Sequence, residues 1–169
     1  MHYLIAVLIE SPDNWEEQVR EALAPFDEEL EVEPYEVDCG LCDAAEAVGT
    51  ERVMELLTSD CPECRGSGVA LSTRNPNRHW DRYQIGGRYQ GWNGGNMVCP
   101  VKDWKEEAAF GIVTLDGEWI DQFTRPEWLG SYTPTPNDIT PEEEAWSAEF
   151  KRQLEAAPDA YIVLVDCHM

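Results

Sequence analysis

The sequence predicts an α+β domain with a mostly antiparallel sheet, helices on one face of that sheet, and a zinc-knuckle insertion. Apolar, strand-like runs stand near both ends of the chain, at residues 3–9 and 160–168, and we expect both to lie centrally in the sheet. Two helical patterns lie between them. Four cysteines in two C-x-x-C pairs mark an insertion at residues 39–64, within a single domain of residues 1–169.

The first helix is expected directly after the N-terminal strand. Ser11 or Asp13 can serve as its N-cap. Apolar side chains then recur at helical spacing, at Trp15, Val19 and Leu23. Between the two cysteine pairs, residues 43–60 predict one broken helix or two short ones.

The second half of the chain predicts a hairpin, a loop, a helix and a buried strand. Asp116 and Gly117 form a hairpin turn signal between two short β-type runs, and residues 125–138 are rich in turn formers. Thr140 can cap a helix. That helix carries large apolar side chains on one face, at Trp146, Phe150 and Leu154. The closing apolar run, residues 160–168, is typical of a strand buried inside a sheet.

The charge of the chain narrows the choice of partners. It carries 34 acidic and 12 basic side chains, for a formal net charge of −22. Such a surface repels nucleic-acid phosphates and anionic lipid, so no direct nucleic-acid binding is expected. Residues 3–9 are too short to span a bilayer and lack the basic flank of a signal peptide, so we expect a cytoplasmic protein.

The cysteine spacing is the most specific signal in the sequence. Cys39, Cys42, Cys61 and Cys64 follow the pattern C-x₂-C-x₁₈-C-x₂-C, which lies in the range of four-thiolate zinc sites. Four thiolates leave no coordination position for a substrate, so we expect a structural zinc ion. The alternative is a set of four reduced, buried thiols.

Residues 65–100 differ in composition from the rest of the chain. They contain five arginines, seven glycines, two tryptophans and two tyrosines, but one acid, Asp81. Arginine suits phosphate, aromatic rings suit a base, and glycine allows a close approach to the backbone. We therefore expect a site for a small anionic ligand, such as a nucleotide. The expected ligand-binding residues are Arg74, Asn75, Trp80, Asp81, Arg82, Tyr83, Gln84, Gly86, Gly87, Arg88 and Trp92.

A structural interpretation of the same residues remains open. Single tryptophans are usually core residues, and the arginines would then pair with the surrounding acids. Whether the protein has catalytic groups also remains open, and the candidates are Asp81, Asp166 and His168. Strand alternation places Asp166 and His168 on one face, within reach of a common ligand, although a solvated chain end would explain them equally well. No hydrolase or P-loop motif is present in the sequence.

Several blocks of the sequence resemble a group of small bacteriophage proteins. The shared features are an L-A-P-Y/F-D/N-E segment, a C-x-x-C-x-G-x-G knuckle, an S-T-x-N-P…W-D-W-Y-x-I-G-G-R-W core and a terminal D-C-H. In this chain they occupy residues 23–28, 61–68, 72–76 with 80–89, and 166–168. Arg82 stands where the group has an aromatic residue and Tyr89 where it has tryptophan. The resemblance implies a viral accessory protein acting in the host-cell cytoplasm, but no established activity.

Three functions are consistent with these observations. The first is sequestration of a nucleotide-derived signalling ligand, which would counter host immunity. The second is hydrolysis of such a ligand by a phosphodiesterase-type enzyme that uses Asp81, Asp166 and His168. The third is an acidic mimic of DNA that inhibits a host defence protein. Homo-oligomers are compatible with each.

Overall fold

The structure is a computed structural model and describes residues 1–42, 61–105, 107–122 and 141–168. Its contacts divide the chain into two compact units. The sheet unit comprises Met1–Glu28 and Asn77–Met169, and the inserted unit comprises Glu29–Pro76. The inserted unit contains the whole of the predicted 39–64 insertion and extends beyond it at both ends. That the chain forms a single domain stays a prediction.

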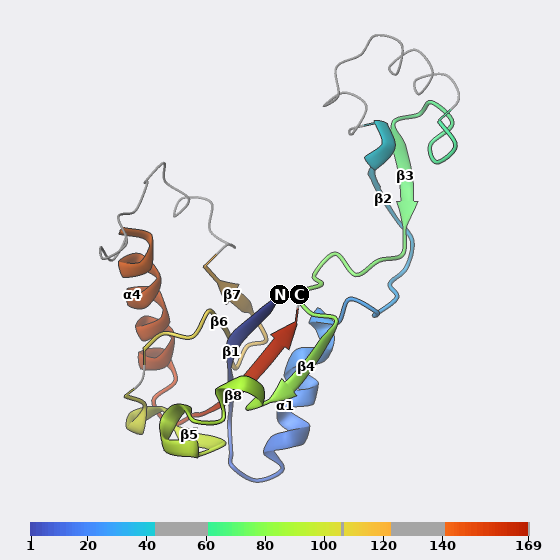
Figure 1. Ribbon diagram of the computed structural model, residues 1–169. Coiled ribbons are helices and arrows are strands. Elements are labelled where there is room, and N and C mark those ends of the chain that lie inside the picture. The colour runs from blue at the N-terminus through green and yellow to red at the C-terminus, as the bar shows by residue number, and fades with distance from the viewer. Residues whose placement is uncertain (43–60, 106, 123–140, 169) are drawn as a thin grey trace. The chain divides into compact units, whose positions relative to one another are not determined.

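The sheet unit is built on a six-stranded sheet in the order β4-β8-β1-β6-β7, with β5 paired to the free half of β8. The central strands β1 and β8 are antiparallel, from His2 opposite His168 to Ile9 opposite Tyr161 (Figure 1). Only the β1–β6 pair is parallel among the described strands, so the predicted mostly antiparallel sheet is confirmed. The strands are β1 His2–Ile9, β4 Arg82–Ile85, β5 Val98–Pro100, β6 Gly111–Val113, β7 Trp119–Asp121 and β8 Tyr161–His168.

The two α-helices described in the sheet unit cover opposite faces of the sheet (Figure 1). Helix α1, Trp15–Leu23, packs Val19 and Leu23 against one set of alternating β1 residues: Ile5, Val7 and Ile9. Helix α4, Pro141–Ala156, packs against the other set: Leu4, Ala6 and Leu8. We call these two sides the α1 face and the α4 face.

The prediction of helices on one face is therefore wrong. The reason is visible in β1 and β8, where apolar residues occupy nearly every position and leave both faces of the sheet to be covered. The predicted apolar stripe of α4 is confirmed, since Trp146, Phe150 and Leu154 are all buried. Helix α1 begins after Asn14, which adopts a left-handed conformation with φ 51° and makes no side-chain cap, rather than at a Ser11 or Asp13 cap.

The predicted hairpin at Asp116 and Gly117 joins β6 and β7. The amide of Gly117 donates to the carbonyl of Thr114 at 3.0 Å, and Gly117 has a φ of 77°, a conformation that suits glycine. Four short 3₁₀ helices complete the described part of this unit: η1 Ala24–Phe26, η2 Gly87–Tyr89, η3 Trp92–Gly95 and η4 Val101–Asp103.

The inserted unit contains a two-stranded antiparallel ribbon. Strand β2, Tyr35–Asp38, pairs with β3, Val69–Ser72. The predicted helices of residues 43–60, the predicted loop 125–138 and the Thr140 cap lie outside the described residues. In the part of the chain that the structure describes, no helix has the length and apolarity needed to cross a membrane.

Candidate functional site

The four cysteines converge at the end of the β2–β3 ribbon. Cys39 follows β2 directly, and its amide donates to the carbonyl of Gly68 at 2.9 Å, which ties the first pair to the turn before β3. The Sγ atoms of Cys39 and Cys61 are 3.6 Å apart, and those of Cys42 and Cys64 are 3.5 Å apart. All four Sγ atoms lie within 4.8 Å of one another.

These distances suit one metal ion better than disulfides. A disulfide requires sulfur atoms about 2.05 Å apart, and none of the cysteines is bonded to another. Tetrahedral coordination with metal–sulfur bonds of about 2.3 Å places neighbouring sulfurs about 3.8 Å apart. The observed 3.5 and 3.6 Å separations are close to that value. The four thiols are thus positioned to hold a metal ion, as the spacing predicts.

The second knuckle also stabilises a thiolate. Burial raises the pKa of Cys64, but hydrogen bonds from the backbone N–H groups of Gly68 and Gly66 and from the thiol of Cys42 outweigh this effect and lower the pKa to about 6. Gly66 and Gly68 have φ values of 85° and 76°, and this left-handed backbone turns their amides toward the sulfur. The glycines that follow the last cysteine therefore serve the site directly.

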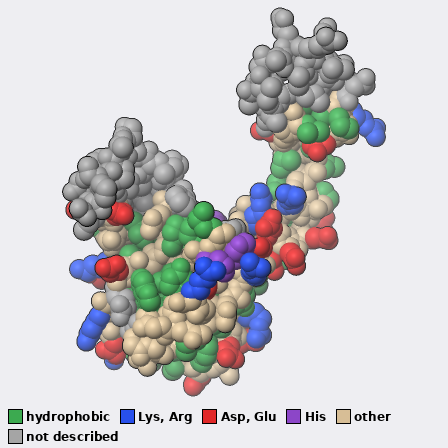
Figure 2. Space-filling model, in the orientation of Figure 1, with side chains coloured by type: hydrophobic (Ala, Val, Ile, Leu, Met, Phe, Trp, Pro, Cys, Tyr) green, Lys and Arg blue, Asp and Glu red, His purple; other side chains and the backbone are tan. Residues whose placement is uncertain are grey.

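A second cluster of ionisable groups lies in the sheet unit, where β1, β4 and β8 come together. We call it the His–Asp cluster, and it consists of His2, Asp81, Asp166 and His168. Nδ1 of His2 lies 2.8 Å from Oδ1 of Asp166, and Nδ1 of His168 lies 2.8 Å from Oδ1 of Asp81. Histidine side chains reach the surface next to Lys or Arg side chains (Figure 2).

Strand register brings these four residues together on the α4 face. His2 is directly opposite His168, and Leu4, two residues further along β1, is directly opposite Asp166. The amide of Asp81 donates to the carbonyl of His168 at 3.1 Å, just before β4 begins. The predicted placement of Asp166 and His168 on one face is thus seen in the structure, where Asp81 and His2 join them.

Both aspartates are held in the ionised form. Burial raises the pKa of Asp166, but hydrogen bonds from His2 and from the backbone amide of Arg88 outweigh it and leave the pKa below its usual value. The hydrogen bond from His168 is the main reason that the pKa of Asp81 is also lowered. Since a carboxylate can only accept a hydrogen bond, each histidine places its proton on Nδ1. Each ring then presents Nε2 as the basic nitrogen.

The turn after β4 brings a cation to Asp166. The Arg88 amide donates to Oδ2 of Asp166 at 3.1 Å, and Nε of Arg88 lies 3.9 Å from the same oxygen. Gly87, with φ 43°, permits this approach, because a Cβ there would lie 2.4 Å from Cβ of Asp166. The preceding Gly86, with φ 69°, donates its amide to the carbonyl of Leu164 at 2.8 Å. The G-G-R sequence therefore positions an arginine over a buried carboxylate.

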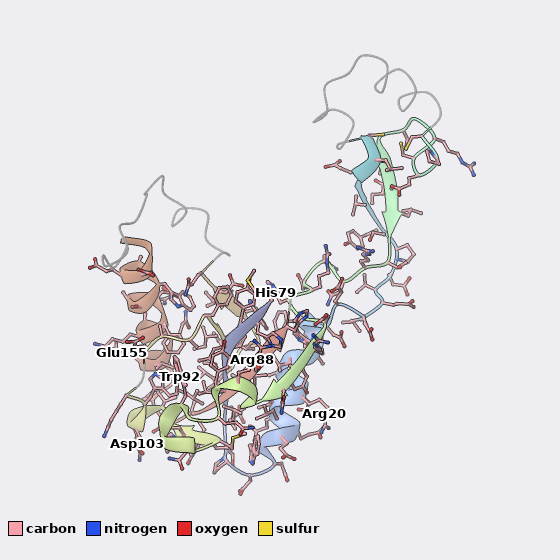
Figure 3. The ribbon with its side chains drawn as sticks, viewed as in Figure 1. Arg20, His79, Arg88, Trp92, Asp103 and Glu155 are labelled. Carbon is pink, nitrogen blue, oxygen red and sulfur yellow. The ribbon has the colours of Figure 1, made fainter. Side chains whose placement is uncertain are left out.

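Two more of the predicted ligand-binding residues share the α4 face with the cluster. Arg82 is directly opposite His168, and Gln84 is directly opposite Asp166, so their side chains leave the sheet on the same side. Arg88 and Trp92 lie on successive turns between β4 and β5 (Figure 3). Trp92 is partly buried against the α4-face core.

Trp80 and Tyr83 lie elsewhere. Both are partly buried against the α1-face core, and Nε1 of Trp80 donates to the carbonyl of Leu23 at 3.0 Å. The structure does not bring these two rings to the His–Asp cluster. Arg74 and Asn75 belong to the inserted unit, where Asn75 is 2% exposed.

A third pair on the α1 face consists of the partly buried His79 and the buried Asp121. Nδ1 of His79 lies 3.9 Å from Oδ2 of Asp121, which also accepts a hydrogen bond from Nε1 of Trp119 at 2.8 Å. The His79 ring stacks on Trp119 with centroids 4.6 Å apart. Burial lowers the pKa of His79, although Asp121 opposes that shift. This pair anchors the chain ahead of β4 to the hairpin strand β7.

His2 is the member of the His–Asp cluster that sequence reasoning missed. No local motif surrounds it, since it opens a plain apolar strand. One signal was available: two terminal strands paired antiparallel along their whole length bring the first residues opposite the last, and therefore His2 opposite the D-C-H ending. No protein-family model, curated protein or solved structure matches this chain.

Proposed function

We propose that the protein binds a small, phosphate-bearing ligand of the nucleotide class at the His–Asp cluster and hydrolyses a phosphate ester in it. The proposal rests on one observation, the pairing of His2 and His168. Nδ1 of each ring is hydrogen-bonded to a different aspartate, and the ring centroids are 5.0 Å apart. Arg88 of the G-G-R turn lies beside this pair, bound to Asp166.

Two aspartate-held imidazoles can divide the proton transfers of a hydrolysis. One Nε2 accepts a proton from water as the water oxygen bonds to phosphorus. The other imidazole, protonated, gives a proton to the ester oxygen as the P–O bond breaks. Water is the co-reactant, and the products are a phosphate and an alcohol. In the present structure Nε2 of His168 lies 3.2 Å from the N-terminal amine, which a ligand would have to displace.

Arginines on the same face suit the substrate. Arg88 is 66% exposed and sits 3.9 Å from Asp166, so its guanidinium can contact a bound phosphate without leaving its carboxylate. Arg82 emerges from β4 opposite His168. Positive groups at this position stabilise the charge that develops on phosphoryl oxygens during the reaction.

Sequestration without cleavage is the second candidate. It is supported by the excess of arginine over acid in residues 65–100, which holds whether or not the ligand is cleaved. It loses some support because Trp80 and Tyr83, the expected stacking residues, pack on the α1 face. A site that only stores a ligand also has no need for two positioned imidazoles.

For the cysteine cluster we propose zinc. Four thiolates saturate its tetrahedral coordination, so the ion would be structural and would brace the β2–β3 ribbon of the inserted unit. The viral setting, in which a phage protein removes a host signalling nucleotide in the cytoplasm, is proposed from the resemblance of the sequence blocks alone.

The test is incubation of the purified protein with cyclic and linear nucleotides, followed by mass analysis of the recovered ligand. Hydrolysis adds one water to a cyclic substrate. We expect His2→Gln and His168→Gln to abolish turnover while binding persists, and Arg88→Gln to weaken binding. Arg20→Gln, an exposed arginine on α1, is the matched control. Binding with the ligand returned intact would assign sequestration, and no binding across the panel would refute both candidates.

A further inference from the structure

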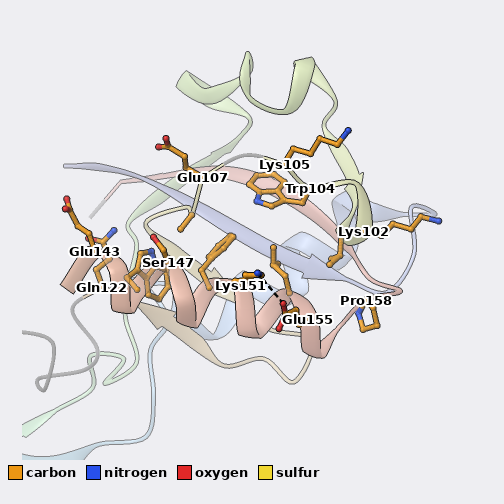
Figure 4. Close-up of a pocket in the computed structure, with 15 residues that line it drawn as sticks. Lys102, Trp104, Lys105, Glu107, Gln122, Glu143, Ser147, Lys151, Glu155 and Pro158 are labelled. Carbon is orange, nitrogen blue, oxygen red and sulfur yellow. Dashed lines mark ion pairs between the residues drawn. The ribbon is translucent and has the colours of Figure 1, made fainter. Parts of the chain in front are cut away.

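A groove on the α4 face is separate from the His–Asp cluster and shares no residue with it. It has a volume of about 900 Å³ and runs between α4 and the segment that follows β5 (Figure 4). Its floor is apolar and is formed by Val101, Trp104, Ala108, Trp146, Phe150 and Leu154. Pockets of this size and character accept drug-sized organic molecules.

All three lysines of the chain line this groove: Lys102, Lys105 and Lys151. The nine arginines lie elsewhere in the sequence, and none of the described ones lines it. Lys151 is paired with Glu155 at 3.8 Å on the exposed side of α4. Lys102 and Lys105 are exposed and lie on the opposite wall. The lining also holds three glutamates, Glu107, Glu143 and Glu155, so the groove as a whole is neutral. In a chain of net charge −22, its Lys102 and Lys105 end is where a negative charge is most favourable.

Trp104, between the two exposed lysines, carries a hydrogen-bond donor without an acceptor. Its Nε1 is buried and has no hydrogen-bond partner among the described residues. The other buried indoles behave differently: Nε1 of Trp146 donates to the carbonyl of Ala109 at 2.7 Å, and Nε1 of Trp119 donates to Asp121. Buried donors are rarely left unsatisfied. Trp104 therefore offers a buried donor that no described residue satisfies and that a ligand acceptor could use.

We propose that the groove binds an amphipathic organic anion with an apolar body and one carboxylate. The apolar body would lie against Trp146 and Phe150, and the carboxylate would lie near Lys102 and Lys105 and within reach of the Trp104 indole after a small side-chain rotation. Glu107 and Glu143 lie toward the other end of the groove (Figure 4). Their charges disfavour a ligand that is anionic along its whole length, such as a nucleic acid.

The first experiment measures displacement of 8-anilinonaphthalene-1-sulfonate fluorescence by dodecanoate and by dodecylammonium, which have the same chain length and opposite charges. We expect dodecanoate to displace the probe at a concentration on the order of tenfold lower than dodecylammonium requires. Two partly screened ion pairs, with Lys102 and Lys105, account for a difference of this size. In the double variant Lys102→Gln, Lys105→Gln this preference disappears. Lys151→Gln, the ion-paired lysine, is the matched control and keeps it. All three lysines are exposed, so their replacement leaves the core intact.

A second measurement follows the Trp104 indole ¹⁵N–¹H resonance, assigned with Trp104→Phe. Dodecanoate should shift it downfield as a new hydrogen bond forms, and dodecylammonium should not. Equal displacement by both amphiphiles, or an unchanged preference in the double lysine variant, would overturn the proposal and leave a groove that is merely apolar. Because the readouts are independent of nucleotide turnover, failure here leaves the proposed hydrolysis untouched, and the reverse also holds.

Discussion

His2 and His168 face each other across the central strand pair, with ring centroids 5.0 Å apart and planes at 72°. Each is held by a different aspartate, one from β8 and one from the residue before β4. The pair joins residues separated by 166 positions along the chain, and it depends on the β1–β8 register. A one-residue slip of one strand against the other would place the two rings on opposite faces of the sheet.

The cysteine cluster should bind about one zinc ion per chain in reduced, freshly purified protein. Elemental analysis measures it directly. Cys61→Ser should lose the ion and open the inserted unit to limited proteolysis, because the sulfur is buried and central to the cluster. Cys99→Ala is the matched control: Cys99 is also buried, but its thiol contacts the carbonyl of Pro100 instead of the cluster. Full metal content in Cys61→Ser would contradict the assignment.

Gly87→Ala should destabilise the sheet unit by roughly 1–3 kcal/mol, the range for a residue forced into a strained backbone conformation. The added Cβ would lie 2.6 Å from Oδ2 of Asp166, and the φ of 43° disfavours any side chain. Urea unfolding monitored by tryptophan fluorescence gives the change. Gly91→Ala is the control, since a Cβ there meets nothing within 4 Å, and its effect should stay within about 0.5 kcal/mol.

Asp166 should make the protein more stable at neutral than at acidic pH. Its folded-state pKa lies below the ordinary value of about 3.9, so the unfolded chain binds its proton more readily. The contribution is therefore complete above the unfolded pKa and is lost as the pH falls through the folded one. Free energies of unfolding measured from pH 3 to pH 7 should show a shallower slope in Asp166→Asn. Asp103→Asn, on an exposed turn, should keep the wild-type slope.

As the pH falls, His79 should cause a separate loss of stability that begins at a higher pH than the loss due to Asp166. Burial lowers its pKa in the folded state, so the unfolded chain takes up the proton first, beginning near pH 6.5. Stability should decline as the pH falls from about 7 toward the folded-state pKa. His79→Gln should flatten the curve in that range while leaving the more acidic Asp166 region unchanged. A wild-type protein equally stable at pH 7 and pH 5.5 would contradict a lowered His79 pKa and the partial burial that causes it.

Some features of the chain follow from local sequence. Each C-x-x-C pair presents its two thiols together because the pair lies on a single tight turn. The Asp116–Gly117 turn and the Trp146, Phe150 and Leu154 stripe likewise depend on neighbours a few residues away. Nearly uninterrupted apolar runs identify the two central strands, since only a strand covered on both faces hides such a run.

What the tertiary structure alone decided is which of these pieces meet. Sequence periodicity gives the phase of β4, but its register against β8 determines that Arg82 and Gln84 share the His–Asp side while Tyr83 faces α1. The tertiary structure also decides that α1 and α4 cover opposite faces of the sheet, because β1 is apolar on both faces. It likewise places His2 in the His–Asp cluster, which no local pattern predicts. Local composition predicts the helices and turns because their backbone hydrogen bonds join residues only a few positions apart. Strand pairing depends on burial and register between segments far apart in the chain, and the free energy of these contacts cannot be assigned to any one segment.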